Sequence, residues 1–170
     1  MALIPNVDHL GPPDFKLAGL AIWVHGRQFP EAQDYWDGNW LNVSVCCEAP
    51  GAIVWASGAI LMNSDIKEWS QQSRKVLDRM KGEAGLQPLE PNLKVTVCST
   101  DRHGHFVMRV EITPNHLEQE HKFEFLIDQT FLTALNSQCD AILKEFPIRD
   151  PLGLRSLLSS LSQNRNLNSF

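Results

Sequence analysis

The sequence predicts an α+β protein in which one antiparallel β-sheet is covered by two α-helices, forming a single two-layer domain. Two kinds of hydrophobic pattern support this class. Several short segments alternate between apolar and polar side chains, which is the period of a half-buried strand. Two longer segments instead repeat apolar residues at helical spacing along one side. Because the connections have hairpin length, the sheet is expected to be antiparallel with its helices on one side.

The clearest strand prediction is Leu41–Glu48, where every second residue from Leu41 onward is apolar. Pro50-Gly51 is a turn signal, and Ala52–Met62 is expected to return beside the first strand as its antiparallel partner. Further strands are expected at 15–24, 93–99, 106–112 and 122–127.

The first helix is expected from about Asp65 to Lys81, with Asn63 or Ser64 as its N-cap and Gly82 after its end. The second is capped by Asp128 and ends at Pro147, which cannot continue a helix. The apolar stripes are Ile66, Trp69, Val76, Leu77 and Met80 in the first helix, and Phe131, Leu135, Cys139, Ile142 and Phe146 in the second.

The length of 170 residues fits one domain better than two. We expect an irregular lead-in at residues 1–14, an α+β domain at 15–147 and a flexible or short-helical tail at 148–170. No internal repeat is evident in the sequence.

The charge balance excludes some functional classes. The chain has 15 basic and 20 acidic residues, a net charge of −5, and no run of Lys or Arg. This balance disfavours direct binding to nucleic acid or to an anionic membrane, and it suits a basic protein partner. No stretch has the roughly 20 apolar residues of a spanning helix, so the cytoplasm is the expected compartment.

The four cysteines Cys46, Cys47, Cys98 and Cys139 have irregular spacing and form no CxxC pair. Cys46 and Cys47 are adjacent and would point to opposite faces of a strand, so a shared disulfide or metal site is disfavoured. We therefore expect free thiols in a reducing compartment, and no cofactor.

Loop histidines offer the main alternative function. His103 and His105 form an HxH pair, and His116 and His121 fall in the next loop. If these loops converge, three imidazoles could hold zinc in a metal-dependent hydrolase or a small-ligand-binding protein. The competing explanation is an ordinary turn built by Asp101 and Gly104. Because no nucleophile elbow, phosphate loop or HExxH motif is present, we expect no enzyme.

The segment Phe29–Trp40 combines large aromatic residues with carboxylates. Aromatic side chains of this kind are strong interface anchors, but they also fill the corners of a core. In the structural interpretation, Gly38 adopts a positive φ, Asp37 and Asn39 hold the turn, and Trp36 and Trp40 plug the end of the core. The residues then left to face a partner are Glu31, Gln33, Asp34 and Tyr35, with Glu118 and Glu120 in a later loop as a second patch.

At this segment the chain resembles the WapI-like immunity family of bacteria. The resemblance rests on Arg27, Phe29-Pro30 and the run from Asp34 to Leu41, with support from Asp128–Leu132 and Phe146-Pro147, and it spans about Leu17 to Pro147. It implies a non-enzymatic cytoplasmic protein that binds and blocks the C-terminal domain of a cognate toxin. It names neither the toxin nor the contact residues. A general adaptor or secretion chaperone is the other binding function that the sequence leaves open.

Overall fold

The computed structural model describes residues 10–101, 103–151 and 153. Within these residues the chain forms eight strands, two α-helices and one 3₁₀ turn at Asp37–Asn39. The elements are β1 (Phe15–Leu17), β2 (Leu20–Arg27), β3 (Trp40–Ala49), β4 (Ala52–Met62), α1 (Asn63–Arg79), β5 (Glu83–Leu86), β6 (Leu93–Ser99), β7 (His105–Ile112), β8 (His121–Asp128) and α2 (Gln129–Glu145).

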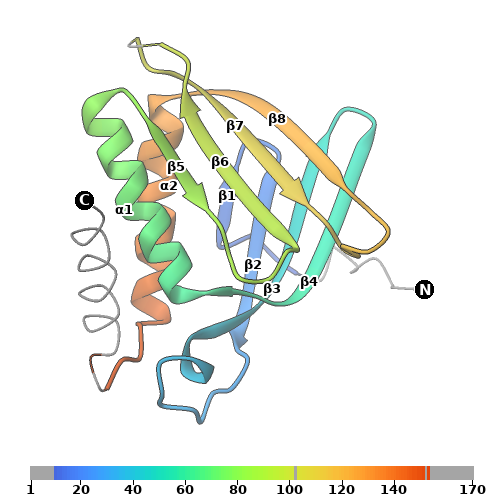
Figure 1. Ribbon diagram of the computed structural model, residues 1–170, viewed down its shortest axis with the longest axis vertical. Coiled ribbons are helices and arrows are strands. Elements are labelled where there is room, and N and C mark those ends of the chain that lie inside the picture. The colour runs from blue at the N-terminus through green and yellow to red at the C-terminus, as the bar shows by residue number, and fades with distance from the viewer. Residues whose placement is uncertain (1–9, 102, 152, 154–170) are drawn as a thin grey trace, which may run out of the picture.

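The strands form two antiparallel sheets, in the orders β1-β2-β3-β4 and β5-β6-β7-β8 (Figure 1). The α+β class is therefore confirmed, while the expectation of a single sheet is wrong. Alternation of side chains reports which face of a strand is buried, but it does not report which strands are neighbours. Here α1 separates β4 from β5, and the chain begins a new sheet after it.

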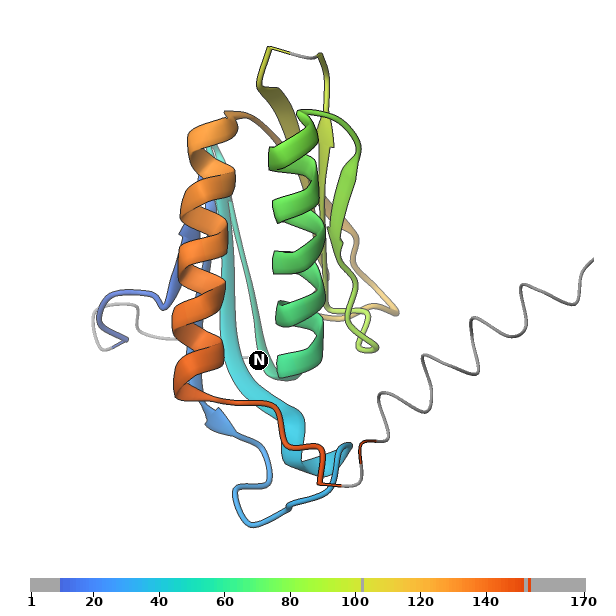
Figure 2. The ribbon, with the colours of Figure 1, turned by 90° about the vertical axis from the view of Figure 1, so that its left-hand side faces the viewer.

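The two halves of the fold share one topology, although no internal repeat is evident in the sequence. Each half consists of four antiparallel strands in chain order followed by one helix. The helices lie side by side (Figure 2) and are joined by an ion pair of 2.6 Å between Arg74 and Asp140. Each helix also packs against the first strand of the other half, α1 on β5 and α2 on β1. The halves are therefore interlocked through their helices.

Both sheets and both helices contribute to one hydrophobic core. Phe15 from β1 lies against Trp69 from α1, with 5.2 Å between their ring centroids. Phe106 and Met108 from β7 and Leu135 from α2 are also fully buried. Because these side chains come from all parts of the fold, the two halves share the main core.

The helix starts follow different local chemistry. Asp128 caps α2 as predicted, since its Oδ1 accepts a hydrogen bond of 2.8 Å from the amide of Thr130. The expected cap of α1 is wrong, because Asn63 and Ser64 lie inside the helix. The carboxylate of Asp65 instead accepts from the amide of Met62 at 2.8 Å. This arrangement frees the side chain of Asn63, which donates to the carbonyl oxygen of Phe146 after α2.

Candidate functional site: the loop between β2 and β3

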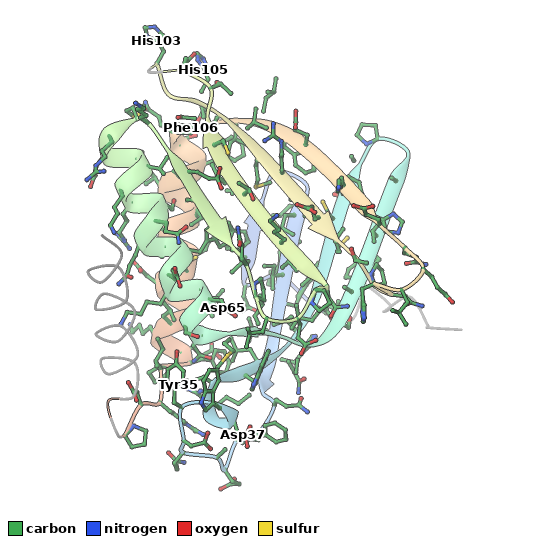
Figure 3. The ribbon with its side chains drawn as sticks, viewed as in Figure 1. Tyr35, Asp37, Asp65, His103, His105 and Phe106 are labelled. Atoms are coloured by element: carbon green, nitrogen blue, oxygen red, sulfur yellow. The ribbon has the colours of Figure 1, made fainter. Side chains whose placement is uncertain are left out.

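The loop between β2 and β3 is an elaborated version of a shorter loop in the second half. Twelve residues (28–39) connect β2 to β3, whereas five (100–104) connect β6 to β7. The shorter loop lies between the end of α1 and the start of α2. The carbonyl oxygen of Gly104 accepts a hydrogen bond of 3.1 Å from the amide of Gln129, the first residue of α2, and Gly104 lies against Met80, which follows α1. The longer loop likewise lies where α1 begins and α2 ends (Figure 3). It contains residues well beyond those needed to connect the strands.

Asp34 organises the centre of the longer loop. Its Oδ1 accepts hydrogen bonds of 2.9 Å from the amides of Trp36 and Asp37, at the start of the 3₁₀ turn. Its carbonyl oxygen accepts from the amide of Gly38 at 3.2 Å. An aspartate that binds amides two and three residues onward fixes a turn. The loop therefore has an internal frame, and Asp34 has a structural role in it.

A second set of hydrogen bonds clamps this loop to the segment after α2. The side chain of Asn39 is fully buried and binds both the amide (2.9 Å) and the carbonyl oxygen (2.7 Å) of Arg149. The guanidinium of Arg149 donates to the carbonyl oxygens of Pro30 and Ala32, and that of Arg27 donates to Gly38 and to Pro147. Burial, together with the nearby charge of Arg149, lowers the pKa of Arg27. Sequence reasoning missed Arg149, for which no local signal exists.

Gly38 is required in this clamp for a reason other than the predicted one. It does not adopt a positive φ, so the expectation of a left-handed turn is wrong. A Cβ at this position would lie 2.9 Å from the carbonyl oxygen of Ala32 and 3.1 Å from Cδ of Arg149. The glycine therefore allows the backbone and the arginine side chain to approach each other closely.

The structure reverses the expected orientations of Tyr35 and Trp36. Tyr35, predicted to face a partner, is 8% exposed, whereas Trp36, predicted to plug the core, is 51% exposed. Their rings meet edge to face with centroids 5.3 Å apart. Both predictions are wrong because a turn sends neighbouring side chains in different directions, and the sequence does not specify which one points inward. Trp40 is half-buried at the start of β3, and Asn39 is the residue that is fully buried.

The outer side of the loop carries Phe29, Glu31, Asp34, Trp36 and Asp37, all of which are exposed; we call these five residues the rim. Within the described residues, none of the ion pairs involves the three carboxylates of the rim. The rim thus combines two exposed aromatic rings and three exposed carboxylates on a rigid support, while the guanidiniums of Arg27 and Arg149 bind the carbonyl oxygens of the loop. This combination is suited to binding a basic protein surface.

Glu118 and Glu120, predicted as a second patch, are exposed in the loop between β7 and β8 of the other sheet. The carboxylate of Glu118 accepts a hydrogen bond of 2.9 Å from the side-chain Nδ2 of Asn115. Glu120 forms an ion pair of 2.6 Å with Lys122, and the hydrogen bond from Lys122 lowers the pKa of Glu120. Because Lys122 offsets the charge of Glu120, this patch is less negative than its sequence suggests.

The loop histidines do not converge, and the zinc arrangement considered from sequence is contradicted. His105 pairs with Asp128 at one end of β7, while His121 pairs with Ile112 at the other end. Successive hairpin loops of an antiparallel sheet lie at opposite ends of the strands, and Figure 3 shows His103 and His105 at one extremity of the molecule. Within the described part of the chain, no three His, Cys, Asp or Glu side chains form a metal-binding group. Asp101 instead binds the imidazole of His105 at 2.7 Å and the amide of His103 at 2.7 Å, as the turn explanation requires.

The four cysteines are free thiols, as predicted. Cys47 lies in the main core, and Cys46 lies in a small cluster on the opposite face of the first sheet. Burial is the main cause that raises the pKa of Cys46 and Cys98 to about 11 and that of Cys47 and Cys139 to about 12. These thiols are therefore protonated at neutral pH and are poor nucleophiles.

Comparison with known proteins identifies the group to which the fold and the rim belong. The model of the Immunity protein WapI-like family matches residues 15–147. The chain belongs to this family. The match begins with the first residue of β1 and covers both sheets, both helices and the whole rim. No curated protein and no solved structure matches the chain.

Membership of the WapI-like family agrees with the chemistry of the site. The family consists of immunity proteins, which act without catalysis. In the described residues, neither helix is long and apolar enough to cross a membrane. Arg149, which holds the rim in place, lies two residues beyond the end of the family match.

Proposed function

We propose that this protein binds the C-terminal domain of a cognate bacterial toxin in the cytoplasm of the producing cell and occludes the toxin's active site. The rim is the centre of this contact. The observation that carries the proposal is Trp36, a large aromatic side chain that is half exposed on a loop held by hydrogen bonds on both sides. Family membership supports neutralisation by binding.

Rigidity makes the rim an efficient binding surface. Association costs conformational entropy when loops and side chains must be ordered, and a pre-organised loop avoids much of that cost. Asp34 and the clamp at Arg149 order this loop before any partner arrives. Trp residues that become buried at the centre of an interface are frequent hot spots. Trp36 is therefore expected to contribute most of the binding energy.

Charge defines the class of partner. Glu31, Asp34 and Asp37 place three exposed carboxylates on the rim, and the whole chain has a net charge of −5. Complementary charges speed association and select against wrong partners. A toxin domain with a basic substrate groove, such as one that acts on nucleic acid, fits this surface best. Glu118 and Glu120 are a second and weaker candidate contact on the other sheet.

The first test is to capture the partner and then to measure its affinity for rim variants. A tagged copy purified from its native host should bring down one stoichiometric partner, the C-terminal part of a large secreted protein. Trp36→Ala should weaken its binding by at least about 2 kcal/mol, roughly 30-fold, without lowering the melting temperature. Leu126→Ala is the matched control, because Leu126 is 85% exposed on β8, outside the rim.

The charge test uses Asp37→Lys, since Asp34 also caps the turn and its replacement would change the loop itself. Asp37→Lys should slow association and reduce its dependence on salt. If the captured toxin binds Trp36→Ala and Asp37→Lys with the wild-type dissociation constant, the rim is not the binding site. Failure to capture any stoichiometric partner would argue against neutralisation itself.

A further inference from the structure

The edges of the two sheets are protected to different degrees. A free edge strand presents unpaired backbone groups, and natural proteins usually shield it with charges, prolines or a covering helix. The edge strands β1 and β5 are each packed against a helix. The edge strand β8 carries Lys122, Glu124 and Asp128. The remaining edge, β4, spans eleven residues and contains neither a charged residue nor a proline.

Only the first part of β4 is regular enough to pair with another strand. Toward its end, Ile60 is an extra residue in the register with β3, since Leu61 pairs with Leu41 but Ala59 pairs with Asn42. Gly58 has a φ of +142° just before this bulge. Such irregularities twist an edge away from further pairing. The segment from Ala52 to Ser57 precedes them and forms the last strand of its sheet, as Figure 1 shows.

The face of the sheet beside this segment is apolar as well. Ile53 is 63% exposed, and the half-buried ring of Trp55 stacks on Trp23 at 5.3 Å between centroids. Together with Cys46, Ala21 and Leu10 these indoles form a small cluster on the side away from the core, and the ring nitrogen of Trp23 donates to the carbonyl oxygen of Gly11 at 3.0 Å. Among the described residues no strand pairs with the outer side of β4, and apolar side chains border this edge on both faces of its sheet, since Val54 and Ala56 belong to the core.

We propose that β4 pairs antiparallel with β4 of a second copy of this chain, about a two-fold axis at Trp55. A two-fold axis at Trp55 places this residue directly opposite Trp55 of the second copy. Directly opposite residues in an antiparallel pair lie on the same face of the sheet. Val54 then faces Ala56, and Ile53 faces Ser57, so every side chain keeps its present face. The indoles of Trp23 and Trp55 from both copies form one continuous stack across the axis.

Charge favours a second copy over a toxin strand at this edge. Two chains with net charge −5 repel each other wherever carboxylates meet, but the segment from Ala52 to Ser57 contains no charged residue. A basic toxin would find one carboxylate beside that segment, that of Glu48 opposite Ile53, whereas the rim carries three. Seven positions along β4 separate Trp55 from Met62, which pairs with Trp40 next to the rim. At about 3.3 Å per residue, the two-fold lies roughly 20 Å from the rim, so both rims of the dimer stay accessible.

The test measures the association of the full chain without any toxin, so its result is independent of the proposed function. Sedimentation equilibrium at protein concentrations from about 1 to about 100 µM should show a monomer–dimer equilibrium. Ile53→Lys should raise the dimer dissociation constant at least about tenfold, because it places two charges in the apolar contact. Leu126→Lys, at an equally exposed position on β8, should leave that constant unchanged.

Amide hydrogen exchange provides a second measurement that needs no variant. Protection of residues 52–57 should rise with protein concentration, while that of β8 should not. A monomer across the whole concentration range would overturn the proposal. So would a dimer that Ile53→Lys leaves intact, or protection of β4 that appears only when toxin is added.

Discussion

Asn39 and Arg149, which are 110 residues apart in the sequence, bind each other in both directions through the amide side chain of Asn39 and the backbone of Arg149. The same side chain also donates to the carbonyl oxygen of Tyr35 at 2.6 Å. One buried amide therefore joins the loop after β2, its own 3₁₀ turn and the segment after α2. This connection makes the C-terminal segment part of the rim's support.

Replacing Asn39 should consequently destabilise the whole fold. Asn39→Ala leaves the backbone groups of Tyr35 and Arg149 without their partner in a buried site, which should cost about 2–4 kcal/mol of unfolding free energy. Urea denaturation measures this loss. Arg149→Ala is the informative comparison, because it keeps both backbone bonds to Asn39 and removes only the guanidinium contacts to Pro30 and Ala32. An equal loss in both variants would show that the amide is not the main connection.

Alanine substitutions at Tyr35 and Trp36 should have separate effects, the first on folding stability and the second on binding of the toxin. Tyr35→Ala removes a buried aromatic side chain and should cost about 3 kcal/mol of unfolding free energy. Trp36→Ala removes a half-exposed one and should change that free energy by less than about 0.5 kcal/mol. Thermal and urea unfolding of the two variants provide the comparison. If Trp36→Ala proved the more destabilising, the assignment of Trp36 to the rim would fail.

In the two-residue turn between β1 and β2, substitutions at Ala18 and at Gly19 should change the unfolding free energy in opposite directions. Ala18 has a φ of 49°, a left-handed conformation that costs an alanine about 1 kcal/mol. Ala18→Gly should relieve this strain and raise the unfolding free energy by about 0.5–1 kcal/mol after the entropic cost of glycine. At Gly19, a Cβ would lie 2.0 Å from the carbonyl oxygen of Glu48 and 2.6 Å from the ring of Phe125.

Gly19→Ala should therefore destabilise the protein by more than about 2 kcal/mol, since the contact joins the turn to β8 of the other sheet. Urea denaturation of both variants tests the pair. Two losses would show that Ala18 is not strained, and two gains would contradict the close approach of Phe125.

The sequence predicted those features that depend on neighbours along the chain. Alternation identified the inward faces of β3 and β7, and the aspartate before α2 identified its cap. The division into two sheets was not predictable in this way, because strand partners depend on contacts between distant segments. Arg149 has no sequence signal for the same reason, since its partners lie more than a hundred residues away.

Two errors about the candidate site have different origins. The orientations of Tyr35 and Trp36 depend on how Asp34 and Asn39 fold the turn, which periodicity does not encode. The separation of the histidines, in contrast, followed from the predicted hairpins themselves. If β6, β7 and β8 are consecutive antiparallel strands, the loops at the two ends of β7 cannot meet.

The raised pKa values of the four cysteine thiols predict how stability depends on pH. Unfolding exposes each cysteine and returns its pKa to about 9, while burial holds the folded values at about 11 to 12. Between these values the unfolded chain has released protons that the folded chain retains, so a higher pH favours unfolding. The thiol contribution to stability is therefore complete below about pH 9 and declines progressively above it. Urea midpoints measured from pH 7.5 to 10 should fall only in the upper part of that range.

Cys98 offers the sharpest version of this test because it is the least buried of the four thiols. After burial, the causes that raise its pKa are the hydrogen bond of 3.1 Å from its Sγ to Glu83 and the negative charge of that residue. Glu83→Ala removes both and should lower the pKa of Cys98, so a disulfide reagent should label the folded protein faster at pH 8.5. Glu90→Ala, in an exposed loop, is the matched control and should leave the labelling rate unchanged. Equal rates in the two variants would mean that burial alone protects the thiol, and that Glu83 does not.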